Sequence, residues 1–136
     1  MSRSIPLAVR RKVSLRANAQ CEYCLVAERV SLYKFHIEHI KSLKHEGTND
    51  LINLAYCCPD CNYYKGSDIG TFSDDGESLI RFYNPRKDRW DDHFELDNGT
   101  IHGKTDIGRA TVKLFKFNDI DRLIFRQQLI DLGLYP

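Results

Sequence analysis

The sequence predicts a single α+β domain with an N-terminal helix, short strands in the middle and two helices at the end. Apolar side chains recur at helical spacing in the first twenty residues, and two runs rich in β-branched and aromatic residues flank a glycine turn further on. A chain of 136 residues has the length of one domain, and its hydrophobic fraction of 42% is ordinary for a globular protein.

The N-terminal helix is expected over residues 6–19. Pro6 suits the first turn of a helix, because the N–H group that proline lacks has no partner there. The apolar residues that follow the helical spacing form one stripe, which consists of Ile5, Val9, Val13 and Ala17. This helix delivers the chain to a first pair of cysteines.

Two strands joined by a loop are expected within residues 32–57. Residues 32–40 and 51–57 are apolar and rich in strand-forming side chains, and a turn over residues 47–50 precedes the second run. A short helix is expected to follow over residues 61–66. The order strand, strand, helix is therefore predicted for the middle of the chain.

Residues 67–136 are expected to extend the same domain with further strands and helices. A strand is expected over residues 79–83, and residues 97–99, with the sequence Asp-Asn-Gly, predict a hairpin turn. Residues 106–117 and 119–132 have the pattern of two helices, which complete the predicted fold.

The charge distribution is uneven although the net charge is only +1. Residues 1–20 hold five basic and no acidic side chains, whereas residues 67–104 hold five basic and nine acidic ones. The basic arm could attract a polyanion, or it could be a solvated helix surface. There is no signal-peptide pattern and no apolar run long enough for a bilayer, so we expect a cytoplasmic protein with no membrane partner.

Two Cys-x-x-Cys pairs are the most specific signal in the chain, and they consist of Cys21 with Cys24 and Cys58 with Cys61. Each pair presents two sulfur atoms from one turn, and four thiolates complete the tetrahedron that zinc prefers. Two disulfides are the alternative, but a chain without an export signal favours reduced thiols and a metal. The fifth cysteine, Cys57, should point away from Cys58 if residues 51–57 are extended.

A second polar group lies between the cysteine pairs, in an otherwise apolar segment. Glu38 and His39 are adjacent, so on a regular strand they point to opposite sides. The Glu38 carboxylate and the amide oxygen of Asn62, next to Cys61, could hold a hard divalent ion such as Mg²⁺. His39 could accept a proton from water near neutral pH. A metal-bound phosphate beside a neutral imidazole is suited to phosphodiester hydrolysis.

These residues together resemble the motif of the HNH endonuclease family, which has a ββα-metal fold. The resemblance covers residues 21–66 and includes both cysteine pairs, His36 to Ile40, Asn49 to Leu54, Asn62, Lys65 and Gly66. Residues 82–86 and 107–111 also resemble, more weakly, the tail of small stand-alone bacterial members of the family.

The resemblance implies a role for each matching residue. His39 falls on the general base of the family, Glu38 on its metal-binding acid, and Asn62 on its final metal ligand. Asn53 falls on the asparagine that holds the loop between the two strands by hydrogen bonds. His36 could assist at the metal or pack, and we expect packing or support from outside the metal site.

The implied activity is hydrolysis of DNA phosphodiester bonds with one divalent ion, Mg²⁺ or Mn²⁺. His39 would take a proton from the attacking water, while the ion held by Glu38 and Asn62 would contact the phosphate and the leaving 3′ oxygen. The family precedent implies products with 5′-phosphate and 3′-hydroxyl ends. Two positions depart from the family: its usual acid is Asp where this chain has Glu38, and its Gly-Gly pair appears here as Glu46-Gly47.

Contacts to DNA phosphates are expected from five basic residues, namely Arg10, Arg11, Lys12, Lys41 and Lys65. No helix with a clear set of base-reading side chains is apparent, so these contacts would not depend on sequence. The alternative function is a zinc-containing nucleic-acid or protein binding module that has lost its activity. The apolar C-terminal helices are compatible with either a monomer or a homodimer.

Overall fold

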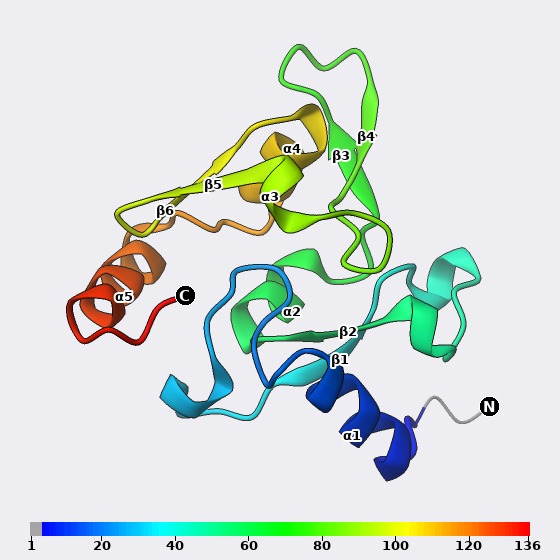
Figure 1. The fold of residues 1–136 in the computed structure, drawn as a ribbon. Coiled ribbons are helices and arrows are strands. Elements are labelled where there is room, and N and C mark those ends of the chain that lie inside the picture. Colours follow the sequence, from blue (N-terminus) through cyan, green and yellow to red (C-terminus); the bar gives the residue numbers. More distant parts are fainter. Residues whose placement is uncertain (1–3) are drawn as a thin grey trace.

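The computed structural model describes residues 4–136 and confirms the predicted α+β class (Figure 1). Within these residues, six short strands pair into three antiparallel two-stranded sheets. The strands are β1 (His36–His39), β2 (Leu54–Cys57), β3 (Gly70–Phe72), β4 (Leu79–Arg81), β5 (Phe94–Asp97) and β6 (Thr100–Gly103). The α-helices are α1 (Leu7–Arg16), α2 (Pro59–Lys65), α3 (Trp90–His93), α4 (Asp106–Leu114) and α5 (Ile120–Asp131).

The centre of the molecule is the hairpin of β1 and β2 followed directly by α2, which is the predicted strand–strand–helix order. The residues of β2 are all buried, because this strand lies between β1 and the rest of the core. Cys58 caps α2, and Pro59 occupies its first position, where no N–H group is needed. Gly66 ends the helix with a positive φ of 53°.

Helix α1 packs against β2 and ends earlier than the predicted residue 19. Asn18 and Ala19 adopt positive φ values of 58° and 51°, which a right-handed helix does not allow. Arg16, the last helical residue, donates hydrogen bonds to the carbonyl oxygen of Leu51 at 2.9 Å and to that of Leu54 at 2.6 Å. These bonds tie the end of α1 to the start of β2.

The C-terminal extension contains the predicted hairpin, with β5 and β6 joined at residues 98–99. Asn98 and Gly99 both have positive φ, 49° and 86°, as a tight two-residue hairpin turn requires. The strand expected over residues 79–83 ends at Arg81. Neither β3 nor the single turn of α3 was predicted, because both are too short to show a periodic pattern.

The extension packs directly on the first cysteine turn. The ring of Tyr23, between Cys21 and Cys24, lies 4.9 Å from that of Phe115 between centroids, and Trp90 donates from Nε1 to the Tyr23 carbonyl oxygen at 2.8 Å. One aromatic core therefore spans the central hairpin region and the C-terminal third. Every helix within residues 4–136 is too short or too polar to cross a bilayer.

Candidate active site and metal centre

The four cysteines of the two Cys-x-x-Cys pairs form one buried cluster. The Sγ atoms of Cys21, Cys24, Cys58 and Cys61 all lie within 4.8 Å of one another. The backbone N–H groups of Cys24 and Cys61 point at the sulfur atoms of Cys21 and Cys58, each at 3.4 Å. The sequence prediction of a shared cluster is confirmed, and all four thiols are free of disulfides.

This cluster has the composition and spacing of a structural zinc site. Four sulfur donors in a buried, closed arrangement suit zinc, which is soft enough for thiolates and tetrahedral in structural sites. Cys57 is buried but lies outside the cluster, as expected from its position on an extended strand. A metal at this place would fix the start of α2 relative to the first cysteine turn.

Glu38 points inward from β1 and is only 4% exposed. Its Oε1 atom forms an ion pair with Nζ of Lys65, and its Oε2 atom accepts a hydrogen bond of 2.7 Å from the hydroxyl of Tyr23. Burial raises the pKa of Glu38, while Lys65 and Tyr23 oppose that shift. The ammonium of Lys65 therefore supplies the positive charge that a buried carboxylate requires.

Lys65 is an internal residue, which corrects its predicted role as a DNA phosphate contact. Its side chain is 2% exposed, and besides the pair with Glu38 it donates to the backbone oxygen of His39 at 3.1 Å. Residues four apart lie on one face of a helix, so Lys65 shares the inward face of α2 with Cys61. Its position near a turn in the sequence gave no sign of this burial.

His39 is half-buried at the end of β1, on the opposite face from Glu38. Its Nε2 atom lies 2.7 Å from Oδ1 of Asn49. If Asn49 accepts from an Nε2–H group, the Nδ1 atom of the imidazole is left as the proton acceptor. Asn49 is part of the motif that resembles the family, but no role was predicted for it, because spacing alone does not show that it faces His39.

Asn53 holds the loop between the two strands. Its Oδ1 atom accepts from the backbone N–H of Lys41 at 2.8 Å, and its Nδ2 atom donates to the carbonyl oxygens of Lys41 at 2.9 Å and Thr48 at 2.8 Å. One side chain thus joins both ends of the loop that carries Asn49. The loop position of Asn49, opposite His39, depends on these three bonds.

The same loop contains Glu46-Gly47, where two glycines were expected from the resemblance. A Cβ atom on Gly47 would lie 1.7 Å from the carbonyl oxygen of Lys41, so only glycine allows the two chain segments to approach so closely. Glu46 adopts a left-handed conformation with φ of 66°, which glycine adopts more readily than glutamate. The chain therefore keeps the glycine that packing requires and tolerates Glu46 at the strained position.

Asn62 is half-buried on α2, one turn before Lys65. Lys65 reaches Glu38 and His39, so this side of α2 faces β1. Within residues 4–136 the side-chain amide of Asn62 makes no hydrogen bond, and it remains available as a ligand. His36 is exposed at the start of β1, so the packing expected of it is not observed.

The oxygen donors of Glu38 and Asn62 have the chemistry that Mg²⁺ or Mn²⁺ prefers. A positive charge already lies at the Glu38 carboxylate in the form of the Lys65 ammonium. A divalent ion at Glu38 would therefore have to replace the contact with Lys65.

Exposed basic side chains lie on the outer surface of α1 and in the loop after β1; they are Arg10, Arg11, Lys12 and Lys41. An open groove of about 400 Å³ runs between α1 and β1, and its lining includes Arg10, Arg11 and Lys34. Four of the five residues expected to contact phosphates are thus accessible, with Lys65 as the exception.

A family model described as HNH endonuclease matches residues 21–68. A curated relative, Septu protein PtuB of Bacillus thuringiensis, is 28% identical over 114 residues, which cover 84% of this chain and 42% of the relative. The chain therefore spans less than half the length of that relative. No solved structure matches the chain. The strand–strand–helix order and the four-cysteine cluster both agree with the match of residues 21–68 to the HNH endonuclease family.

Proposed function

We propose that this chain is a metal-dependent endonuclease that hydrolyses DNA phosphodiester bonds, with His39 as general base. The observation that carries the proposal is the position of the His39 imidazole. It is half-buried at the end of β1, and the 2.7 Å contact between its Nε2 atom and Asn49 leaves Nδ1 free to accept a proton. A histidine that served only to pack would not need a polar partner beside an accessible nitrogen.

The roles of the other residues follow from their places around His39. Asn49 holds the imidazole in one orientation, and Asn53 holds the loop that carries Asn49. Glu38 and Asn62 would hold the divalent ion. When bound, that ion would stabilise the charge that develops on the phosphate and the leaving oxygen. The basic side chains of α1 and the loop would hold the DNA backbone without reading its sequence.

A second candidate function is favoured by the ion pair of Glu38 with Lys65. A carboxylate that already has a buried internal counter-charge does not require a metal ion. A chain locked in this state would be a zinc-containing nucleic-acid or protein binding module without activity. The two functions differ in whether a divalent ion can replace the ammonium of Lys65 at Glu38.

Nicking of supercoiled plasmid with Mg²⁺ or Mn²⁺ tests the proposal. His39→Ala should lower the cleavage rate by about 100-fold or more, the contribution of a general base, with zinc content unchanged. His102→Ala is the matched control, because His102 is an exposed histidine on β6 and should leave the rate unchanged. Full activity of a clean His39→Ala preparation would overturn the assignment of the base. A wild-type protein that binds DNA and never cleaves it with either ion would establish the binding module.

A further inference from the structure

Arg122 of α5 contacts the four-cysteine cluster although it lies far from the cysteines in the sequence. Its Nη2 atom donates to Sγ of Cys61 at 3.1 Å and lies 3.9 Å from Sγ of Cys58. The side chain is 9% exposed, so the contact is shielded from water. Both sulfur atoms belong to the second cysteine pair, at the start of α2.

The guanidinium of Arg122 is fixed from its other side by the segment between α4 and α5. Its Nη1 atom donates to the carbonyl oxygens of Phe115 at 2.5 Å and Lys116 at 3.3 Å. The Cζ atom of Arg122 lies 5.7 Å from the centre of the Phe117 ring. The side chain thus bridges two parts of the fold, because its rigid fork can donate in several directions at once.

The charge of the cluster explains why an arginine is suited to this place. Zinc carries two positive charges and four thiolates carry four negative ones, so a loaded site keeps a net negative charge in a buried location. A buried charge is costly unless it is paired and hydrogen-bonded. Arg126, the other buried arginine of α5, donates to Gly99 and Asn118 instead. Among residues 4–136, Arg122 is the cation that contacts the sulfur atoms.

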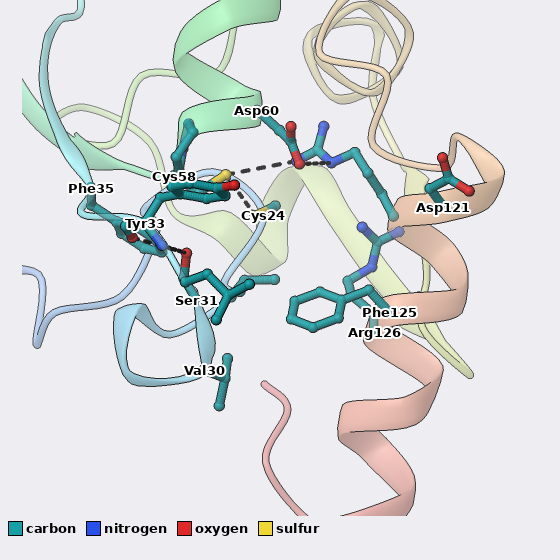
Figure 2. Close-up of a pocket in the computed structure, with 14 residues that line it drawn as sticks. Cys24, Val30, Ser31, Tyr33, Phe35, Cys58, Asp60, Asp121, Phe125 and Arg126 are labelled. Carbon is teal, nitrogen blue, oxygen red and sulfur yellow. Dashed lines mark hydrogen bonds and ion pairs between the residues drawn. The ribbon is translucent and has the colours of Figure 1, made fainter.

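The acid nearest to this arginine does not remove its charge from the cluster. Asp60 lies 3.7 Å from Nε of Arg122, but its carboxylate is 63% exposed and largely hydrated. Figure 2 shows Cys58 and Asp60 on one side of a cavity, with Asp121, Phe125 and Arg126 on the other. This cavity has a volume of about 360 Å³ and separates the cysteine turns from the exposed part of α5. The side chain of Arg122 extends from α5 to the sulfur atoms along the edge of this cavity.

We propose that Arg122 is a positioning residue of the zinc centre and couples the presence of zinc to the docking of α5. With zinc bound, the thiolates of Cys58 and Cys61 hold the guanidinium, and the guanidinium holds α5 against the core. Without zinc, the sulfur atoms are no longer held in one arrangement, so the contacts of Arg122 with Cys58 and Cys61 weaken and α5 is held less firmly against the cysteine turns. The proposal concerns the metal centre alone and does not depend on whether the chain cleaves DNA.

Spectroscopy of the Co²⁺-substituted protein tests the contact with the sulfur atoms. Donation from Arg122 lowers the energy of the thiolate electrons, so Arg122→Met should move the thiolate-to-cobalt charge-transfer band to longer wavelength. Zinc affinity, measured by competition with a chelator, should also fall about 10- to 100-fold, the usual effect of losing a partner of a metal ligand. Asp121→Asn, which changes the adjacent charge without touching sulfur, is the matched control and should change neither property.

A wild-type band and wild-type zinc affinity in folded Arg122→Met protein would overturn the proposal. Arg122→Lys, which keeps the charge and loses the fork, is the second variant if Arg122→Met does not fold. Arg122→Lys should show a smaller shift of the charge-transfer band in the same direction. Wild-type behaviour of this variant would also contradict the proposal. Hydrogen exchange tests the coupling: residues 120–131 should exchange faster after zinc removal from the wild type. Equal exchange with and without zinc would disprove the coupling.

Discussion

The buried pair of Glu38 and Lys65 gives a sharp prediction about stability. Their side chains are 4% and 2% exposed, so neither charge can be hydrated if its partner is lost. Lys65→Met should therefore destabilise the protein by about 3–5 kcal/mol, because it leaves an unpaired carboxylate in the core. The double variant Glu38→Gln with Lys65→Met should lie within about 2 kcal/mol of the wild type, since a glutamine can still accept from Tyr23.

The assay is urea denaturation of the four proteins of the cycle, with zinc present at saturation. The two changes should couple by at least about 2 kcal/mol, as expected for residues in direct contact. Additive effects, with the double variant as unstable as the sum of the single ones, would refute the reasoning. They would mean that the ion pair contributes nothing beyond the packing of the two side chains.

The pH dependence provides a second check with a definite sign. Burial raises the pKa of Glu38 and Lys65 opposes this, so Lys65→Met should raise it further. The folded state then binds a proton more readily than the unfolded state. The destabilisation of Lys65→Met should therefore have its full size at a pH above the raised pKa of Glu38. It should diminish as the pH falls through that pKa. The double variant, which has no carboxylate at position 38, should lack this trend.

Two further predictions concern the loop that faces His39. In the plasmid assay, Asn49→Ala should lower the cleavage rate about tenfold or more at unchanged DNA affinity. Asn49→Asp keeps an acceptor for the Nε2–H group of His39 and should retain most of the wild-type rate. Equal rates for the two variants would show that Asn49 is not part of the site. Gly47→Ala should lower the free energy of unfolding by about 1–3 kcal/mol in urea denaturation, because the added Cβ would collide with Lys41. Glu46→Gly should stay within about 1 kcal/mol of the wild type, because glycine adopts the left-handed conformation of this position more readily than glutamate.

Features that depend on local sequence were predicted correctly. The spacing within each cysteine pair is a property of one turn, and the hairpin at residues 98–99 needs only its two central residues. Element ends were predicted less well, because they depend on partners. The first strand was expected over residues 32–40 but comprises only His36–His39. Its partner strand ends at Cys57, opposite His36, because α2 begins at Pro59, and beyond His39 the facing chain is a short 3₁₀ helix at Leu51–Asn53.

Contacts between distant residues could not be predicted from spacing. Lys65 lies 27 positions after Glu38, and Arg122 lies 61 positions after Cys61. Each is one of many basic residues in the chain, and only the packing of α2 and α5 selects it as the partner of a buried anion. The sequence therefore indicated the cysteine cluster, but it could not indicate which basic residues lie beside it and beside Glu38.

The two sides of β1 explain how adjacent residues can have such different roles. His39 faces the loop, where water and Asn49 can reach it, whereas Glu38 faces α2, where Lys65 and Tyr23 enclose it. Helix α2 supplies the internal cation of this carboxylate, and one turn before Lys65 it carries Asn62, the second ligand in the proposed metal site. A divalent ion at Glu38 must compete with the ammonium. Lys65→Met should therefore gain more thermal stability from added Mn²⁺ than the wild type does, and equal gains would place the catalytic metal away from Glu38.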